Sequence, residues 1–215
     1  MEKNNPLYKN QGIHLISSIF TVMDGNLKVL LIKRNNEPFK GKWALVGGAL
    51  YNNETVDEGM RREIIEKTGI KEIDLHFSHI SSDINRSPLM RMIAINYVGL
   101  VDYKKLSLLK KSLKTTDCDW IDINLVPDLA YDHNEIFINS LETLKKLINT
   151  TNIMKSLFNY EFTIPEIQNV YETILNKKLD RRNFRKKLLQ TDLIIETNNY
   201  KNYKGNKPAK LYKFR

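Results

Sequence analysis

The chain has 215 residues, of which 41% are hydrophobic and 27% charged, the composition of an ordinary soluble globular protein with a core of its own. Its single cysteine, Cys118, excludes a disulfide framework and a cysteine-built zinc site. The net charge is +9, and residues 150–215 carry most of it, with 14 Lys and Arg against 6 Asp and Glu. This asymmetry indicates a neutral domain joined to one that meets a polyanion.

Two β-rich runs, residues 13–21 and 28–32, are separated by Asp24-Gly25-Asn26, a sequence typical of a hairpin turn. The first eleven residues are polar and lack a signal-like apolar run, and no stretch has the length of a bilayer span. We therefore expect a cytoplasmic protein without a membrane partner.

A glycine turn then leads into a predicted helix. Thr55 and Glu58 form the pattern of a capping box that begins the helix, and Gly69 suits the left-handed residue that ends it. An apolar stripe with a spacing of four marks the buried face and consists of Val56, Met60 and Ile64. Glu63 lies at the edge of this stripe, so we expect it to point inward and to need a partner or a metal ion.

This stretch resembles the Nudix box. The matching positions are Gly48, Glu54, Arg62, Glu63, Ile64, Glu66, Gly69 and Ile70. The departure is Lys67, where the family has a second adjacent glutamate. The resemblance implies an α/β/α sandwich with a mixed sheet, in which a Trp-containing strand delivers the glycine turn to the helix. In hydrolases of the family, the glutamates hold divalent ions that activate water against a nucleoside diphosphate.

Lys67 changes what the box is expected to do. An ammonium supplies no ligand to a metal and repels one, so Glu54, Arg62, Glu63 and Glu66 are read as a vestigial site. Metal binding by Glu63 and Glu66 is then weak or absent, no cofactor is required, and hydrolysis with Mg²⁺ is at most residual. Lys67 can pair with Glu63 at i+4 or contact a ligand phosphate. In the alternative, Lys67 turns to solvent and the three glutamates still bind metal.

Further along, residues 73–81 and 91–101 predict two strands, and residues 104–114 allow no assignment. The connecting loop carries Arg86 and Arg91, whose guanidinium forks suit phosphate or carboxylate unless they are simply solvated. Helical periodicity over residues 134–149 predicts a closing helix, with His133 as a capping or hydrogen-bonding residue before it.

The polar junction at 149–152 divides the chain into domains of residues 1–150 and 151–215. In the second domain, Thr163 and Glu166 form another capping box, and Asp180 can cap a second helix over residues 181–191. Strand-like runs at 193–197 and 209–214 flank a polar tip. Helix, turn, basic helix and hairpin follow in the order of a winged helix-turn-helix, so the whole chain is of the α+β class.

The basic second helix suits entry into the DNA major groove. Arg182 and Lys186 can bond guanine edges and Asn183 can bond adenine, with Phe184 and Leu188 facing inward. The full set of candidate DNA contacts is Arg181, Arg182, Asn183, Arg185 and Lys186 on this helix and Lys201, Lys204, Lys207 and Lys210 on the hairpin. A merely solvated basic face is the alternative, and no aromatic platform supports RNA binding.

Residues 179–188 and 207–214 are similar to the C-terminal domain of Nudix-related transcriptional regulators, among them the NrtR-type repressors and a branch that regulates sugar use. The resemblance covers essentially the whole chain. It implies a homodimer on a palindromic double-stranded operator and a Nudix domain that senses an effector, which is ADP-ribose in the NrtR branch. Candidate ligand contacts are Arg86, Arg91, Phe39, Gly48 and Lys67. The main hypothesis is a ligand-controlled repressor, and the alternative is an active Nudix pyrophosphatase with an accessory basic domain.

Overall fold

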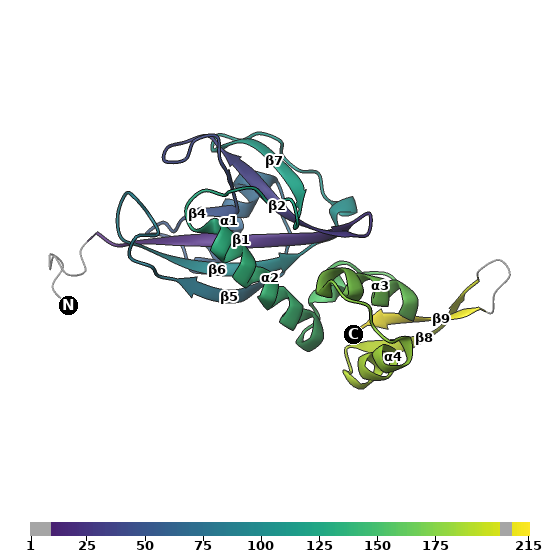
Figure 1. The fold of residues 1–215 in the computed structure, drawn as a ribbon. Helices are drawn as coiled ribbons and strands as arrows, with labels where there is room; N and C mark the ends of the chain where they lie inside the picture. The colour runs from purple at the N-terminus through teal and green to yellow at the C-terminus, as the bar shows by residue number, and fades with distance from the viewer. Residues whose placement is uncertain (1–9, 203–207) are drawn as a thin grey trace.

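The seven-stranded sheet of the N-terminal unit is mixed. In the computed structural model, which describes residues 10–202 and 208–215, the strand order is β3-β2-β1-β6-β5, with β4 paired to β1 and β7 to β2 (Figure 1). The strands are β1 (Gly12–Met23), β2 (Asn26–Arg34), β3 (Trp43–Ala44), β4 (Val46–Ala49), β5 (Leu75–Ser81), β6 (Met92–Leu100) and β7 (Thr115–Asp122). β1 and β6 run parallel, and their neighbours run antiparallel.

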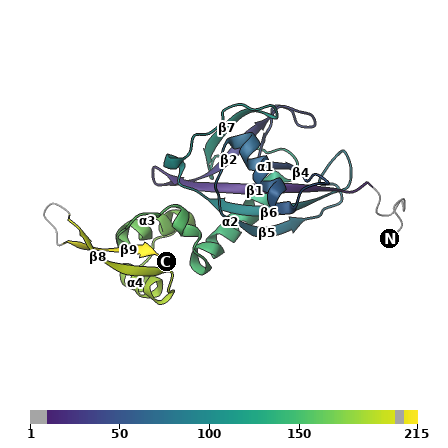
Figure 2. The same ribbon diagram turned by 180° about the vertical axis from the view of Figure 1, so that it is seen from behind.

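The central strand β1 is buried on both faces. Because side chains alternate along a strand, Leu15 and Ile19 face helix α1 (Val56–Thr68), while Ile16 and Phe20 face helix α2 (His133–Thr150). Figure 1 shows α2 across one face of the sheet, and Figure 2 shows α1 across the other. The expected α/β/α sandwich with a mixed sheet is confirmed.

Helix α1 begins and ends where its sequence predicts. The Thr55 N–H donates to the Glu58 carboxylate at 2.8 Å, and the Glu58 N–H donates to Thr55 Oγ1 at 3.3 Å, so both halves of the capping box form. Gly69 adopts a φ of 79°, which favours glycine and ends the helix. Met60 and Ile64 are fully buried.

The hairpin between β1 and β2 is confirmed, but β7 is a strand that the sequence did not reveal. Its residues Asp117, Asp119 and Asp122 interrupt the apolar alternation by which strands are recognised. Pairing with β2 over residues 28–34 nevertheless orders the segment, because the ladder satisfies its backbone. The unassigned segment 104–114 holds a short 3₁₀ turn, η1 (Tyr103–Lys105), followed by irregular chain.

The C-terminal unit has the predicted winged-helix order. A 3₁₀ turn, η2 (Ile153–Ser156), precedes α3 (Ile164–Leu175) and α4 (Arg181–Gln190), and β8 (Ile194–Lys201) pairs with β9 (Ala209–Phe214). The capping box of Thr163 and Glu166 forms, and Asp180 caps α4. Phe184 and Leu188 are buried as expected.

The two units share one hydrophobic core. Buried residues of β1, β2 and α2 continue without a break into η2, α3 and the winged hairpin. Tyr171 Oη donates to the Ile148 carbonyl at 2.5 Å, and Thr173 Oγ1 donates to the Gly25 carbonyl at 3.3 Å. Over the residues that the structure describes, no helix combines the length and apolar character needed to cross a membrane.

Candidate functional site

The glycine turn brings the β4 backbone against helix α1. Gly48 stands opposite Leu15 in the sheet, and a Cβ on Gly48 would collide with the carboxylate of Glu63. A Cβ on Gly47 would collide with the Leu15 carbonyl. These positions therefore require glycine because the Glu63 side chain and the β1 backbone occupy the space that any larger residue would need.

Lys67 is buried in the centre of the box. Its side chain is 9% exposed, its Nζ lies 2.8 Å from Glu63 Oε2, and it donates to the Gly47 carbonyl. The predicted i+4 pair is present, and the alternative in which Lys67 turns to solvent is wrong. The Gly47 carbonyl thus accepts from an ammonium. A buried carboxylate needs such a partner, which explains why α1 retains the pair.

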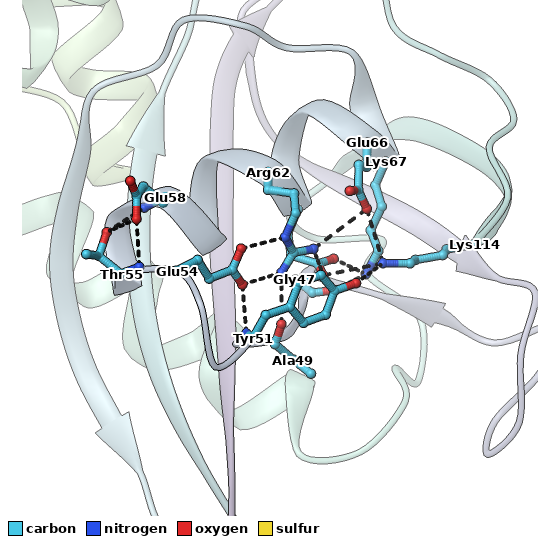
Figure 3. Close-up of polar contacts among 11 residues, drawn as sticks. Gly47, Ala49, Tyr51, Glu54, Thr55, Glu58, Arg62, Glu66, Lys67 and Lys114 are labelled. Atoms are coloured by element: carbon cyan, nitrogen blue, oxygen red, sulfur yellow. Dashed lines mark hydrogen bonds and ion pairs between the residues drawn. The ribbon is translucent and has the colours of Figure 1, made fainter.

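Arg62 binds the remaining carboxylates of the box (Figure 3). Its Nε and Nη2 donate to the two oxygens of Glu54 at 2.8 and 2.7 Å, while Nη1 lies 2.5 Å from Glu63 Oε1. The Tyr51 ring lies under the guanidinium, 3.8 Å from its centre, and the Tyr51 N–H donates to Glu54. The hydrogen bonds from Arg62 lower the pKa of Glu54 to about 2, so this carboxylate is ionised at neutral pH.

A third cation, Lys114, approaches from the segment before β7. Its Nζ lies 3.1 Å from Glu66 and 3.6 Å from Glu63 (Figure 3). Burial alone would raise the pKa of Glu63, but the neighbouring Lys67, Arg62 and Lys114 outweigh it and lower this pKa, so Glu63 stays charged. Burial lowers the pKa of Lys67, although Glu63 opposes the shift.

This arrangement does not fit a divalent ion. An ammonium lies 2.8 Å from one Glu63 oxygen and a guanidinium lies 2.5 Å from the other, so each oxygen faces a protein cation at the place where a metal ion would have to bind. In the described ranges, 10–202 and 208–215, no three Asp, Glu, His or Cys side chains are placed to hold a metal. Magnesium needs several oxygen ligands, so a step that depends on it has no support here.

The loop arginines have different environments. The Arg86 side chain is fully buried and forms a bidentate ion pair with Asp132, in which Nε and Nη2 each donate to one carboxylate oxygen at 2.8 Å. Its Nη1 is buried and has no hydrogen-bond partner among the described residues. Arg91 Nη1 instead donates to the Ser82 and Asp83 carbonyls at 2.8 Å, so Arg91 braces the loop that carries Arg86.

A cavity of about 380 Å³ lies beside Arg86 and is lined by Phe39, Asp83, Asn85, Pro88, Tyr131, Asp132 and Glu135. The Phe39 and Tyr131 rings meet edge to face at 4.7 Å, and the Arg34 guanidinium lies 5.0 Å from the Tyr131 ring. Trp43, by contrast, packs against the core on the α2 side. The cavity thus combines aromatic faces with the Arg86 guanidinium, which suits a planar ring joined to an anion.

Two histidines border this region in the neutral state. Burial, followed by the charges of Arg86, Lys67 and Arg34, lowers the pKa of His14 to about 4. His133 Nδ1 accepts a hydrogen bond from the Leu45 N–H at 3.1 Å, and burial holds its pKa well below the ordinary value. The expectation that His133 serves as a hydrogen-bonding residue at the helix start is met.

The shifted pKa of His14 predicts a pH-dependent stability. As the pH falls from about 6.5 to about 4, His14 binds a proton in the unfolded chain but not in the folded chain. The free energy of unfolding therefore decreases over this range, by an amount on the order of 3 kcal/mol. We expect His14→Gln to lose this component of the pH dependence in urea unfolding between pH 4 and 7. Parallel curves for the two proteins would show that the burial of His14 carries no such penalty.

The exposed face of α4 carries unneutralised positive charge. Arg181, Arg182, Arg185 and Lys186 are exposed, and no described carboxylate pairs with any of them. Asn183 is exposed as well, while Lys210 pairs with Glu196 at 3.3 Å. A cavity of about 460 Å³ is lined by the three α4 arginines, Lys210 and the start of α3. Lys204 and Lys207 lie outside the described residues.

Comparison with known protein families gives a match for each half of the chain. The NUDIX domain family matches residues 13–139, and the NrtR DNA-binding winged helix domain matches residues 154–214. An ADPR-responsive transcriptional repressor from Acinetobacter baylyi is 31% identical over 201 residues, covering 92% of this chain and 79% of its own. The chain belongs to the NrtR family.

Solved structures agree with this assignment. NrtR from Shewanella oneidensis, bound to a 27mer DNA, superposes with a TM-score of 0.77 at 26% identity over 94% of this chain and 93% of its own. Its NUDIX domain in complex with ADP ribose gives a TM-score of 0.60 over 65% of this chain and 93% of its own. An ADP-ribose pyrophosphatase from Methanocaldococcus jannaschii is 34% identical over 128 residues, covering 58% of this chain and 72% of its own.

The sequence alone did not predict several residues of this NrtR family site. Tyr51 lies between matching positions of the box and carries no chemical signature of its own, and Lys114 lies in the unassigned segment. Asp132 precedes α2 without a motif of its own, and Arg34 and His14 lie inside strands. Their roles depend on partners far along the chain. The only local signal was the basic character of residues 104–114.

Proposed function

We propose that this NrtR family member is a transcriptional repressor that binds operator DNA and is controlled by ADP-ribose, which its Nudix domain binds without hydrolysing. Residues 1–150 would sense the ligand and residues 151–215 would bind DNA. The observation that most supports binding without hydrolysis is the buried Lys67–Glu63 ion pair, which stands where a hydrolase of the family would hold its metal. The named functions of the Acinetobacter and Shewanella relatives support the same proposal.

The cleft offers what ADP-ribose recognition needs. Lys67 and Arg86 are proposed to attract the diphosphate, since the charges of both act on His14 and Arg86 has a buried N–H without a partner among the described residues. Phe39 is proposed to contact the adenine or ribose, and Gly48 to act indirectly, by leaving the space that the Glu63 carboxylate fills. We propose that Arg91 acts through the loop it braces, because its guanidinium is already bound to carbonyls.

The proposal predicts two results with ADP-ribose. The purified protein should bind a duplex from its own upstream region, and ADP-ribose should weaken that binding at least tenfold, a coupling on the order of 1.4 kcal/mol. Incubation with ADP-ribose and Mg²⁺ should release no AMP at enzyme-like rates, since no three Asp, Glu, His or Cys side chains of the described residues are placed to hold the metal. Fluorescence anisotropy and chromatography of the nucleotides provide the two measurements. Rapid AMP release would favour the pyrophosphatase instead.

A homodimer on a palindromic operator is the proposed assembly. The edge strand β5 exposes Phe77 and Ile80, each 56% exposed, on the α1 side of the sheet, and the following loop exposes Ile84 and Leu89. Large exposed apolar side chains on an edge strand suit burial against a second copy. We expect Phe77→Glu with Ile80→Glu to convert a dimer to a monomer in light scattering. The same size for both proteins would place the interface elsewhere.

A further inference from the structure

Helix α2 connects the ligand cleft with the DNA-binding unit. At its start, His133 Nδ1 accepts a buried hydrogen bond from the Leu45 N–H between β3 and β4, and Asp132 just before it lines the ligand cavity. At its end, the Ile148 carbonyl accepts the Tyr171 hydroxyl of α3, and both residues are buried. Figure 1 shows α2 running from the sheet to the winged-helix unit. A packed helix moves as a body, so a shift at its start reaches α3.

The start of α2 is the one described α-helix N-terminus whose N-cap side chain is diverted. Thr55, Thr163 and Asp180 each accept a hydrogen bond from the first turn of their own helices. Asp132 occupies the N-cap position of α2 but makes no such bond. Its two oxygens accept from Arg86 instead. An Asp at this position ordinarily caps its helix from an extended backbone, whereas Asp132 has a φ of −89° and a ψ of 18° and directs its carboxylate to Arg86.

Arg86 is incompletely satisfied in this pair. Its Nη1 is buried and has no partner among the described residues, although its neighbours line the aromatic cavity. A buried donor without an acceptor is unfavourable, and an anionic oxygen in the cavity would satisfy it. Arg34 and Lys67, whose charges act on the same His14, add to the attraction for an anion.

A phosphate at Arg86 would place a second anion beside the Asp132 carboxylate. Like charges a few ångströms apart in a poorly hydrated site repel strongly, and a phosphate competes well for a guanidinium fork. Once the Asp132 backbone turns to the extended conformation of the other three N-cap residues, its carboxylate can accept from the first-turn N–H groups at the positive end of the α2 dipole. Exchange of partners therefore leaves both groups satisfied.

We propose that the Arg86–Asp132 ion pair is the switch between the ligand and DNA sites. The ligand phosphate takes Arg86, Asp132 moves to cap α2, and the start of α2 rearranges. The change reaches α3 through the bond of Tyr171 to Ile148. This inference rests on the proposed function, and it identifies which contact couples the two activities.

Asp132→Asn tests the switch. The amide retains the shape of the side chain but weakens its hold on Arg86, so the variant should resemble the ligand-bound protein. We expect its operator affinity without ligand to fall at least tenfold, and further addition of ADP-ribose to change it less than twofold. ADP-ribose itself should bind at least as tightly as to the wild type in calorimetry. Glu142→Gln is the matched control, since it removes a charge from α2 outside the ligand cavity and should keep wild-type coupling.

Tyr171→Phe tests the contact between the C-terminal end of α2 and α3, and it remains informative if Asp132→Asn fails to fold. It removes the hydroxyl bond to Ile148 while keeping the buried ring, so ADP-ribose should bind as before but release the operator less than half as effectively. Wild-type coupling in either folded variant overturns the switch. So does an Asp132→Asn protein that loses ADP-ribose binding while keeping full operator affinity, because Asp132 would then only position Arg86. If the wild type itself shows no effect of ADP-ribose on DNA, the proposed function fails instead.

Discussion

Lys67→Glu should convert the ion-paired box into a metal-dependent one. The change removes the ammonium that neutralises Glu63 and adds a carboxylate beside a side chain that is 2% exposed. Breaking a buried ion pair costs about 3–5 kcal/mol, which for a chain of this size corresponds to a loss of roughly 10 °C in Tm. Mg²⁺ or Mn²⁺ should restore much of this loss, because the two carboxylates and the Gly47 carbonyl become available as ligands.

Lys67→Met separates the two effects of that substitution. It also removes the ammonium, so it should be destabilised, but it adds no metal ligand and should not respond to Mg²⁺ or Mn²⁺. Thermal unfolding with and without metal, together with calorimetry, compares the two variants. If Lys67→Glu binds Mn²⁺ no better than the wild type, the box is not a former metal site disabled by Lys67.

Arg182→Ala should abolish sequence-selective DNA binding. Arg182 and Lys186 lie four residues apart on the α4 face opposite Phe184, where no described carboxylate neutralises them. Loss of a bidentate contact to a base edge costs about 1–3 kcal/mol, or roughly a tenfold to hundredfold loss of affinity for the operator and little for unrelated duplexes. Anisotropy titrations against operator and scrambled DNA measure the ratio.

Two further variants identify the kind of contact. Lys210→Ala should weaken binding to every duplex and reduce the dependence on salt, because a phosphate contact anchors without reading sequence. Lys71→Ala is the matched control, since Lys71 is an exposed lysine of the Nudix domain, outside the winged-helix unit. An unchanged operator-to-scrambled ratio in Arg182→Ala would mean that α4 does not read the bases.

The sequence by itself determined the local elements of this protein. Thr55 with Glu58, Thr163 with Glu166, and Gly69 mark helix boundaries because capping bonds and left-handed turns join residues only a few positions apart. The glycine and glutamate spacing located the box, and the charge of residues 150–215 with the order of their elements indicated the winged helix. Each of these signals is read within one helix, turn or hairpin.

Only the tertiary structure decided what surrounds Glu63 and Arg86. Whether Lys67 turned inward or to solvent depended on the Gly47 carbonyl, which β4 brings near only through its pairing with β1. Pairing of β7 with β2 brings Lys114 to Glu66, 48 residues away, and folding brings Arg86 to Asp132 across 46 residues. Such neighbours are set by strand register and packing, which no local pattern encodes. The box that resembles a catalytic centre is therefore, in the folded chain, a set of ion pairs.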